Sequence, residues 1–490
     1  MAREHEKIVN IPLKNPLVDP ESFVLNPENG PDAADAKVPW RLKDIYSNIA
    51  DYRTVPTSIF RDQDYAQKEW DLMFTKAWLY AGRASDCREP GDWFRYDIGP
   101  ESIVVIRGSN GELKAFYNVC KHRGNRLLNS DFGKGATAIA CTFHSWMWDT
   151  DGKIKRVTDK ETFRSEALCG DLNLSEVHVD EWAGMVFVSM SKNPMPLHDY
   201  LGKELIGSCT GYAMEKWHVV KEVQLEIPCN WKAAIDSFQE IYHVHMLHPG
   251  GRGNVDEHYC QYDYYPNGHN RMLVPFGLVS HRLENRNEMT PIMAGFLRDV
   301  GIDPETYKGD LAAGDARRDM QKAKRRPDNR FGVDFSRLTD GQLTDDWNFS
   351  LFPGITLNVH AEGTLIQRFR PTADLNPARA IYDLTVIVPS MKPGAGAPWY
   401  FGLEPELDIT GKTRPARRYT TADNTGVGAL LDEDVINMPK QERGMRSAGI
   451  DRIRFSEQEG RCQQQYAEID LYIKGLKTAV PVRPKTLRSA

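Results

Sequence analysis

The sequence lacks any stretch of 18 consecutive apolar residues, and its first residues carry charges with no apolar segment behind them. We therefore expect neither a membrane-spanning helix nor a secretory signal, and we expect a cytoplasmic protein. The sequence also lacks an excess of one charge, since 62 basic residues face 68 acidic ones for a net charge of −6. Without a broad cationic surface, neither nucleic acid nor an anionic membrane is an expected partner.

Cysteine is sparse, with eight residues spread over 490. This density excludes a disulfide-stapled secreted scaffold, and most of the thiols are expected to be reduced and buried. Two nucleotide-binding signatures are missing as well, because no Gly-x-Gly-x-x-Gly follows a strand and no Gly-Lys-Ser/Thr loop is present. We therefore expect that electrons from NAD(P)H would have to arrive through another protein.

Apart from these absences, the composition is that of an ordinary globular protein, with 41% hydrophobic and 27% charged residues. The length suggests two or three domains. Residues 1–55 are expected to be an N-terminal arm, because the first 40 are polar and Pro-rich. Aromatic residues at helical spacing predict a helix over residues 56–74, packing on the second domain. Short alternating strands predict a small β domain over residues 75–195. Residues 196–490 mix both patterns and form a second domain, with a polar, solvated insertion near 303–345.

Individual elements are predicted most clearly in the β domain. Strands are expected over Trp93–Ile98, Ile103–Arg107, Leu113–Val119 and Gly184–Met190, with Asn110-Gly111 marking a hairpin turn. In the second domain, Cys229–Leu247 reads as one helix. A final amphipathic helix begins with the capping pair Ser456 and Glu459.

Two mixed pairs of metal-binding residues lie inside the β domain, Cys120-x-His122 and Cys141-x-x-His144, with 18 residues between them. The four side chains could hold a structural zinc ion, but zinc patterns commonly pair Cys with Cys and His with His. One of each in both halves favours a binuclear 2Fe–2S cluster, with the cysteines on one iron and the histidines on the other. Neutral imidazole ligands raise the reduction potential of such a cluster to about −150 to +300 mV, against about −400 mV for all-cysteine ferredoxins.

Cys120-Lys-His122-Arg-Gly and Cys141-Thr-Phe-His144 closely resemble the Rieske iron–sulfur signature. Phe143 stands where that family usually has Tyr, and Ser145 where it usually has Gly. Neither position supplies a ligand, so these differences bear on hydrogen bonding around the cluster and on its potential.

A second group of metal-binding residues follows in the larger domain. Glu240 and His243 share one polar strip of the predicted helix, beside an otherwise apolar face. His248 lies five residues beyond His243, about 140° around an ideal helix, so the two can share a metal only if the helix ends. Pro249 and the glycines after it supply that ending. His245 is expected to point away.

Two histidines and one carboxylate with open positions form the arrangement that holds non-haem Fe(II) and activates oxygen. The best source of the carboxylate is the segment after Leu431, where three acids follow one another, Asp432, Glu433 and Asp434. Composition does not choose among them.

Asn230-Trp-Lys, Tyr242-His243 and His248-Pro249 resemble the catalytic signature of the large (α) subunits of Rieske non-haem iron ring-hydroxylating oxygenases. The resemblance implies an α+β fold, in which a small all-β Rieske domain precedes a helix-grip domain, a curved antiparallel sheet on long helices. It implies Asp434 as the third iron ligand, with Asp432 as the fallback because Glu442 replaces a usual Gln. It also implies that Glu240 hydrogen-bonds His243 and a cluster histidine, His144, across the subunits of a trimer.

The function implied by the resemblance is that of a terminal oxygenase, which uses O2 and electrons from a ferredoxin or an iron–sulfur flavoprotein reductase. It would mono- or cis-dihydroxylate a hydrophobic aromatic or polycyclic substrate, as a homotrimer with or without a small β subunit. The alternatives are a Rieske monooxygenase for O- or N-demethylation, and, from another class, an electron carrier or zinc-stapled interaction protein. Tyr262, Tyr264, Tyr265 and residues 351–357 are candidates to line the substrate pocket, although packing is their commoner use.

Overall fold

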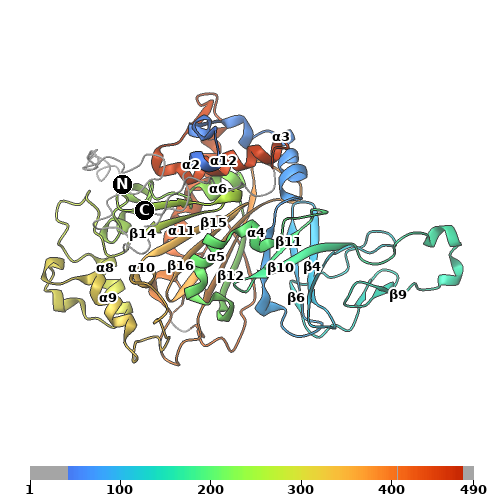
Figure 1. The fold of residues 1–490 in the computed structure, drawn as a ribbon, viewed down its shortest axis with the longest axis horizontal. Helices are drawn as coiled ribbons and strands as arrows, with labels where there is room; N and C mark the ends of the chain where they lie inside the picture. Colours follow the sequence, from blue (N-terminus) through green and yellow to red (C-terminus); the bar gives the residue numbers. More distant parts are fainter. Residues whose placement is uncertain (1–41, 405–406, 478–490) are drawn as a thin grey trace. The chain divides into compact units, whose positions relative to one another are not determined.

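The computed structural model describes residues 42–404 and 407–477, which Figure 1 colours along the chain. Most of the arm expected over residues 1–55 therefore lies outside the described residues. The described part of that segment contains the helix α2 (Leu42–Ile45) and the strand β1 (Thr54–Pro56), which pairs antiparallel with β20 (Arg452–Arg454). Among the described residues, no helix combines the length and the apolar character needed to cross a membrane.

The chain forms two compact units, and the smaller contains residues 63–200 and 370–376. Its main sheet has the order β2-β11-β10-β5-β4-β3-β6, and a second, three-stranded sheet has the order β7-β8-β9. The strands are β2 (Leu79–Arg83), β3 (Trp93–Ile98), β4 (Glu101–Arg107), β5 (Leu113–Tyr117), β6 (Phe132–Gly133), β7 (Ile139–Ala140), β8 (Met147–Trp148), β9 (Ile154–Arg156), β10 (Glu176–Trp182) and β11 (Met185–Ser189). The four predicted strands are confirmed as β3, β4, β5 and β11. Gly111 has φ +82° in the predicted hairpin turn, a conformation that favours glycine.

The helical segment before this β domain differs from the single helix expected over residues 56–74. It consists of α3 (Gln63–Glu69) and a π-helical turn (Trp70–Phe74), and both belong to the smaller unit rather than to the larger one. Trp70 explains this position. Its ring packs so closely on Gly99 of this unit that a Cβ added to Gly99 would lie 2.6 Å from the ring. Gln63 adds a hydrogen bond from its Nε2 to the carbonyl of Leu375, also in this unit.

The larger unit contains residues up to 62, 201–369 and from 377 onward. It is built on an eight-stranded sheet with the order β13-β14-β15-β16-β17-β18-β12-β19, in which β19 joins β12 in parallel. The strands are β12 (His218–Ile227), β13 (Gln261–Tyr264), β14 (Asn270–Val274), β15 (Asp346–Leu351), β16 (Ile355–His360), β17 (Gly363–Pro371), β18 (Ala380–Val388) and β19 (Arg418–Thr421). Strands β14 to β18 are buried along nearly their whole length, so both faces of this part of the sheet are covered.

Three helices pack on this sheet or on one another beside it (Figure 1). Helix α6 (Trp231–Asp236) contacts β18, α11 (Ala429–Met445) contacts α6 and β12, and α12 (Gly460–Ile473) contacts β13. A curled antiparallel sheet on long helices confirms the expected helix-grip architecture and the α+β class. The other helices are α4 (Leu197–Leu201), α5 (Lys203–Cys209), α7 (Val244–Leu247), α8 (Pro291–Asp299), α9 (Ala316–Arg325) and α10 (Asp340–Thr344).

The predicted capping pair Ser456 and Glu459 forms a capping box, which caps a short 3-10 turn (Glu457–Glu459) that leads into α12. The expectation of an amphipathic helix is wrong, however, because its polar side chains are buried as well as its apolar ones. Arg461 shows the reason: its Nε donates to Asn270 Oδ1 at 2.5 Å and its Nη2 to Asn348 Oδ1 at 2.7 Å. Hydrogen-bond partners on the sheet replace water for this polar face.

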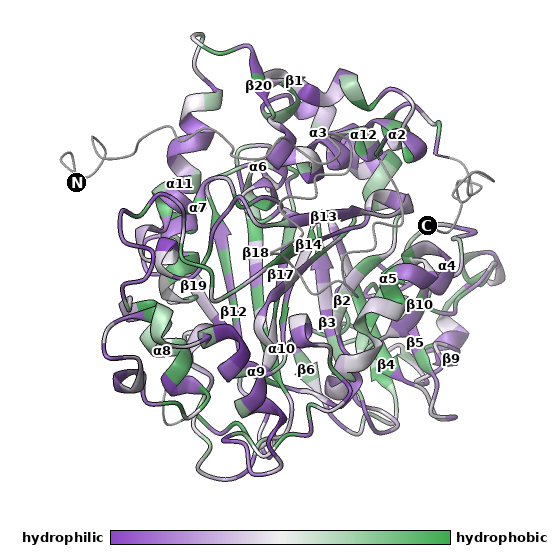
Figure 2. Cartoon of the chain, turned by 60° about the vertical axis from the view of Figure 1, so that its left-hand side comes forward, coloured by the Kyte–Doolittle hydropathy of each residue, from purple (hydrophilic) through white to green (hydrophobic). Residues whose placement is uncertain are grey.

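The segment 303–345, expected to be a solvated insertion, is folded. Helices α9 and α10 lie within it, and Met320, Phe331 and Leu338 are buried. Figure 2 shows α9 as mostly hydrophilic, which is the composition from which solvation was inferred. Apolar side chains anchor the segment, and some of its charges are buried as ion pairs, such as Asp345 with Arg317 and Lys324 with Glu362.

Candidate active site and cluster site

The four predicted cluster ligands lie on two loops of the smaller unit. Cys120 and His122 follow β5, and Cys141 and His144 lie between β7 and β8. Both thiols are buried among apolar side chains, whereas both imidazoles are half-buried. The backbone N–H groups of Cys120 and Cys141 donate to Asn125 O and Trp146 O, both at 2.8 Å, which fixes the two loops. The loops thus hold the thiols inside and the imidazoles toward the surface.

Hydrogen bonds stabilise negative charge on one of the two sulfurs. Cys141 Sγ accepts from the backbone N–H of Phe143 at 3.4 Å and from Asn125 Nδ2 at 3.6 Å. Burial alone would raise the pKa of Cys141, but the backbone N–H groups of Phe143 and His144 hold that pKa below its ordinary value. At Cys120 burial prevails and raises the pKa of the thiol. An anionic sulfur that accepts N–H groups is suited to ligating a metal.

The two histidines lie side by side, with ring centroids 4.6 Å apart. The His122 ring stacks on Trp146 at 4.9 Å, and its buried Nδ1 has no hydrogen-bond partner among the described residues. A single zinc ion would need donor atoms within about 4 Å of one another. Among the described residues, two groups of three or more potential ligands have donor atoms within 4.8 Å of one another. Neither group contains any of these four residues. The spacing therefore fits a larger, binuclear group better than one zinc ion.

The helix expected over residues 229–247 is interrupted, which corrects the sequence analysis. Helix α6 ends at Asp236, α7 starts at Val244, and the residues between them form no regular helix. Asn230 begins α6, with its side-chain oxygen accepting from Lys232 N at 3.0 Å. The interruption lets the Glu240 carboxylate turn back to His243, instead of lying one turn away on a helix face. His248 has φ −116° and ψ 70°, so α7 ends before Pro249 as predicted.

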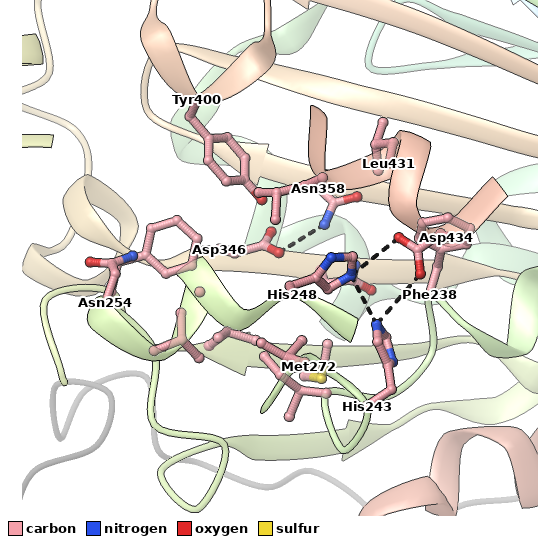
Figure 3. A pocket seen from close by; sticks show the side chains of 18 of the residues that line it. Phe238, His243, His248, Asn254, Met272, Asp346, Asn358, Tyr400, Leu431 and Asp434 are labelled. Atoms are coloured by element: carbon pink, nitrogen blue, oxygen red, sulfur yellow. Dashed lines mark hydrogen bonds and ion pairs between the residues drawn. The ribbon is translucent and has the colours of Figure 1, made fainter. Parts of the chain in front are cut away.

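Three side chains that are distant in sequence converge in the larger unit (Figure 3). The Nε2 atoms of His243 and His248 lie 3.2 Å apart. Asp434 Oδ1 lies 3.5 Å from His243 Nε2, and its Oδ2 lies 3.4 Å from His248 Nε2. Asp434 is buried, and its Oδ1 has no hydrogen-bond partner among the described residues. This spacing fits three ligands on one face of a metal ion.

Carboxylates hold the other nitrogen of each imidazole. Glu240 Oε1 lies 2.5 Å from His243 Nδ1, and Glu433 Oε2 lies 2.6 Å from His248 Nδ1. Although burial opposes it, the carboxylates of Glu240 and Asp434 raise the pKa of His243 to about 9. Each ring is thus fixed with Nε2 directed at the common point. Glu433 was one of the three acids that could supply the iron ligand, and its contact with His248 Nδ1 was not predicted, although its position before Asp434 could have suggested it.

Asp432, the fallback candidate, and His245, which was expected to point away, both have other partners. Asp432, the fallback ligand, accepts from Val427 N at 3.1 Å and from Thr425 Oγ1, so it fixes the start of α11. His245 Nδ1 lies 3.9 Å from Glu257 Oε1, and His245 belongs to neither group of metal-binding side chains.

A cavity opens beside the three converging residues and encloses about 740 Å³ of space free of protein atoms, its mouth included. Its wall is mostly apolar, from Phe238, Ile241, Val244, Val255, Met272, Val274, Phe276, Ile292, Phe296, Tyr400, Leu430 and Leu431. Polar residues on β15 and β16 line part of it, namely Asp346, Asn348 and Asn358. No lysine or arginine is among the lining residues that the structure describes.

The suggested pocket residues elsewhere do not line this cavity. Tyr262 and Tyr264 are buried in a hydrophobic core, Tyr265 is buried nearby, and none of the three is among the described lining residues. Residues 351–357 are also missing from the described lining. These aromatic and aliphatic side chains are used for packing.

Family models match both units. The catalytic-domain model of the ring-hydroxylating α subunits matches residues 214–475, just over half of the chain, and the Rieske [2Fe-2S] model matches residues 77–167. Together with the donor sets described above, these matches identify the cofactors as a Rieske 2Fe–2S cluster and a mononuclear iron.

Characterised relatives share about 30% of their residues over the matched segments. The carnitine monooxygenase oxygenase subunit of Escherichia coli K12 is 31% identical over 208 residues, 41% of this chain and 54% of that protein. The benzene 1,2-dioxygenase α subunit of Pseudomonas putida is 31% identical over 196 residues, 38% of this chain and 42% of that protein. The chain thus spans about half the length of the curated relatives it matches.

Solved structures share the fold over most of the chain. A quaternary ammonium Rieske monooxygenase in complex with L-carnitine has a TM-score of 0.60 at 19% identity, covering 88% of this chain and 99% of that one. Naphthalene 1,2-dioxygenase from Rhodococcus sp. has a TM-score of 0.57 at 17% identity, covering 87% and 97%. By its matched catalytic and Rieske domains, the chain belongs to the family of ring-hydroxylating oxygenase α subunits.

Proposed function

We propose that this protein is the terminal oxygenase of a multicomponent Rieske system. His243, His248 and Asp434 would hold the mononuclear iron, and Cys120, His122, Cys141 and His144 would hold the cluster. When bound, the iron supplies oxygen activation and the cluster supplies the electrons for it. The observation that carries the proposal is the convergence of two imidazole Nε2 atoms and the Asp434 carboxylate beside a mostly apolar cavity.

The residues around the iron site have separate tasks in this proposal. Glu240 and Glu433 would orient the imidazoles through their Nδ1 atoms, which fixes the tautomer that presents Nε2 to the metal. The apolar wall would hold a hydrophobic aromatic or polycyclic substrate and exclude water from the reacting atoms. Three protein ligands leave positions for oxygen on the metal.

Electron delivery would need partners. No nucleotide-binding signature is present in the sequence, so a ferredoxin or an iron–sulfur flavoprotein reductase would reduce the cluster. Following the family resemblance, Glu240 would also accept a hydrogen bond from His144 of a neighbouring copy, in a homotrimer with or without a small β subunit.

Two alternatives follow from other observations. Carnitine and glycine betaine monooxygenase subunits are among the relatives, which favours O- or N-demethylation as the second candidate. An electron carrier without oxygenase activity would explain the cluster loops but would leave the three converging ligands without a use.

Oxygen-18 incorporation tests the proposal. Protein with both iron sites loaded, a surrogate ferredoxin and reductase, and a panel of ring compounds are incubated under ¹⁸O₂. We expect products that carry ¹⁸O, and none from Asp434→Ala with its cluster intact. Release of formaldehyde would instead identify demethylation. A fully loaded, reducible protein that incorporates no label into any ring compound or methylated amine would overturn the proposal in favour of the carrier.

A further inference from the structure

Asn348 lies on β15, an inner strand of the sheet that forms one wall of the active-site cavity. It stands opposite Met272 of β14 on one side and opposite Asn358 of β16 on the other. Residues directly opposite each other on neighbouring strands share a face of the sheet, and all three line the cavity. Asn348 therefore adds a polar amide to a wall that is mostly apolar.

A buried arginine fixes the direction of this amide. Arg461 of α12 has no exposed surface, and its Nη2 donates to Asn348 Oδ1 at 2.7 Å. A guanidinium carries only donors, so the amide atom that faces it must be the oxygen. The NH2 group of Asn348 therefore points away from Arg461. The charged donor on the amide oxygen also polarises the amide, which makes its N–H groups stronger donors.

The nitrogen of this amide is available to a ligand. Asn348 Nδ2 has no hydrogen-bond partner among the described residues. The partnerless side-chain atoms that have no accessible surface include Asp346 Oδ1 but not Asn348 Nδ2, so this nitrogen keeps some surface in the cavity that the residue lines. Water satisfies the N–H groups while the cavity is empty, and a substrate that displaces the water must replace its hydrogen bond.

The other two asparagines of the cavity do not compete for this role. Asn358 Nδ2 donates to Asp346 Oδ2 at 2.8 Å, and its Oδ1 accepts from Gln367 Nε2 at 2.9 Å, so both ends of its amide are used. Figure 3 shows the first of these bonds. Asn254 Oδ1 accepts from Gly277 N at 2.8 Å. Each amide oxygen that lines the cavity thus already accepts a hydrogen bond from the protein, and what the amides still offer is N–H groups.

The charges of the cavity favour a neutral acceptor. Its described lining contains no lysine or arginine but three acids, Glu240, Asp346 and Asp434. A substrate anion would therefore meet carboxylates and no cationic side chain. An ammonium group only donates, so it could not use the N–H groups of an amide. A carbonyl oxygen accepts a hydrogen bond without carrying a charge, and it suits this position.

We propose that Asn348 determines the substrate specificity, by donating a hydrogen bond from Nδ2 to a carbonyl oxygen of a largely apolar ring compound. This inference rests on the proposed function and narrows its substrate class from ring hydrocarbons to ring ketones. Arg461 is a positioning residue in this arrangement, because it holds the amide and is not among the described residues that line the cavity.

Binding of matched probes tests the proposal without turnover. The iron-loaded protein is titrated, without reductant, with 1-indanone and indane, acenaphthenone and acenaphthene, and 9-fluorenone and fluorene. Each ketone has a carbonyl group where its partner has a CH2 group. In at least one pair we expect the ketone to bind about tenfold tighter or more, because a site built to hydrogen-bond a polar group disfavours the analogue without it.

Asn348→Asp isolates the contribution of the N–H groups. One carboxylate oxygen can still accept from Arg461, and the other replaces the NH2 group by an atom that cannot donate. We expect the preference for the ketones to fall to about threefold or less. Asn348→Leu removes the whole polar group at similar size, and the same loss of preference is expected from this second variant.

Asn270→Asp is the matched control. Asn270 Oδ1 accepts from Nε of the same Arg461 at 2.5 Å, but Asn270 is not among the described residues that line the cavity. The substitution brings the same charge to the same guanidinium, so the preference for the ketones should remain about tenfold. An equal loss of preference in this control would trace the effect to the charge beside Arg461 and would overturn the proposal.

Three further results would overturn it. One is the absence of a ketone preference in every pair, including no binding of any probe, and another is a preference that persists in both Asn348 variants. The third is a crystal structure of a ketone complex in which the carbonyl oxygen lies beyond about 3.2 Å from Asn348 Nδ2. Failure of the oxygenase function would appear differently, as a preserved ketone preference without ¹⁸O in any product.

Discussion

Glu240 holds His243 at two points: its Oε1 lies 2.5 Å from the imidazole Nδ1, and its Oε2 accepts the backbone N–H of the same residue at 3.0 Å. One carboxylate thereby fixes both the ring and the main chain of a proposed iron ligand. A carboxylate on Nδ1 selects the tautomer with a free Nε2 lone pair and makes that nitrogen a stronger ligand.

Two substitutions at Glu240 are predicted to differ. In Glu240→Gln the amide oxygen still accepts from His243 Nδ1, so the iron should remain while the negative charge is lost. We expect reoxidation of the reduced cluster by oxygen and substrate to become at least about tenfold slower, measured by stopped-flow absorption. In Glu240→Ala the acceptor is gone, and the affinity for iron should fall about 10- to 100-fold in a chelator competition.

Glu226→Gln is the matched control, because this carboxylate is half exposed and pairs with Arg379 away from the site. It should leave both measurements unchanged. Unaltered cluster reoxidation in Glu240→Gln would contradict the proposed route of electrons, and an active, fully coupled monomer would contradict the transfer between subunits.

Two acids of α11 are predicted to have different roles, Asp434 as an iron ligand and Asp432 as a structural residue. Asp434→Ala should reduce the iron content from about three to about two per chain and abolish product formation, while the cluster spectrum stays intact. Asp432→Ala should keep all the iron and lower the free energy of unfolding by about 1 kcal/mol, because it loses its bond to Val427 N. Loss of iron in the second variant but not in the first would reverse the assignment.

The sequence predicted best what local spacing determines. His243 and His248 could be paired because Pro249 ends a helix, and the cysteine and histidine pairs are recognisable by their spacing alone. The continuous helix through Glu240 was predicted wrongly, since periodicity does not reveal where a bond to a neighbouring side chain, here from His243 to Glu240, replaces the helical one. The choice among Asp432, Glu433 and Asp434 depended on the direction of a helix that packs on distant elements.

The polar positions of the cavity could not be predicted. Asp346 follows another Asp in a segment rich in charge, and nothing local distinguishes it from a surface acid. The hydrogen bond from Asn358 Nδ2 to its Oδ2 depends on the register of β15 and β16. Strand register and long-range hydrogen bonds are set by the whole sheet.

The cluster histidines give a prediction that is independent of the iron site. His122→Ala should remove the Rieske-type low-field signal from the electron paramagnetic resonance spectrum of the reduced protein, because one nitrogen ligand is lost. Binding of one iron at the mononuclear site should persist. Trp146→Phe is the control, since it keeps an aromatic ring against His122. An unchanged spectrum in His122→Ala would exclude this residue as a ligand.

Asp236 carries the last prediction, a dependence of stability on pH. Tyr466 Oη donates to its Oδ2 at 2.5 Å and Gln465 Nε2 to its Oδ1 at 3.0 Å. Burial nevertheless raises the pKa of Asp236 to about 8, against about 3.9 for an unfolded chain. Between these values the folded state binds more protons than the unfolded state, so the free energy of unfolding should fall as pH rises toward 8 and level off above it.

Asp236→Asn has no proton to lose, so its stability should lack this fall. We expect the difference in the free energy of unfolding, variant minus unsubstituted protein, to rise by up to about 1.4 kcal/mol per pH unit between pH 5 and 8. Urea denaturation at matched pH values measures it, and taking the difference cancels the groups that titrate alike in both proteins. The variant can be less stable at pH 5, where the neutral acid keeps both of its hydrogen bonds. A difference that is constant from pH 5 to 9 would mean that Asp236 is charged in the fold throughout, with its two donors compensating for the loss of water.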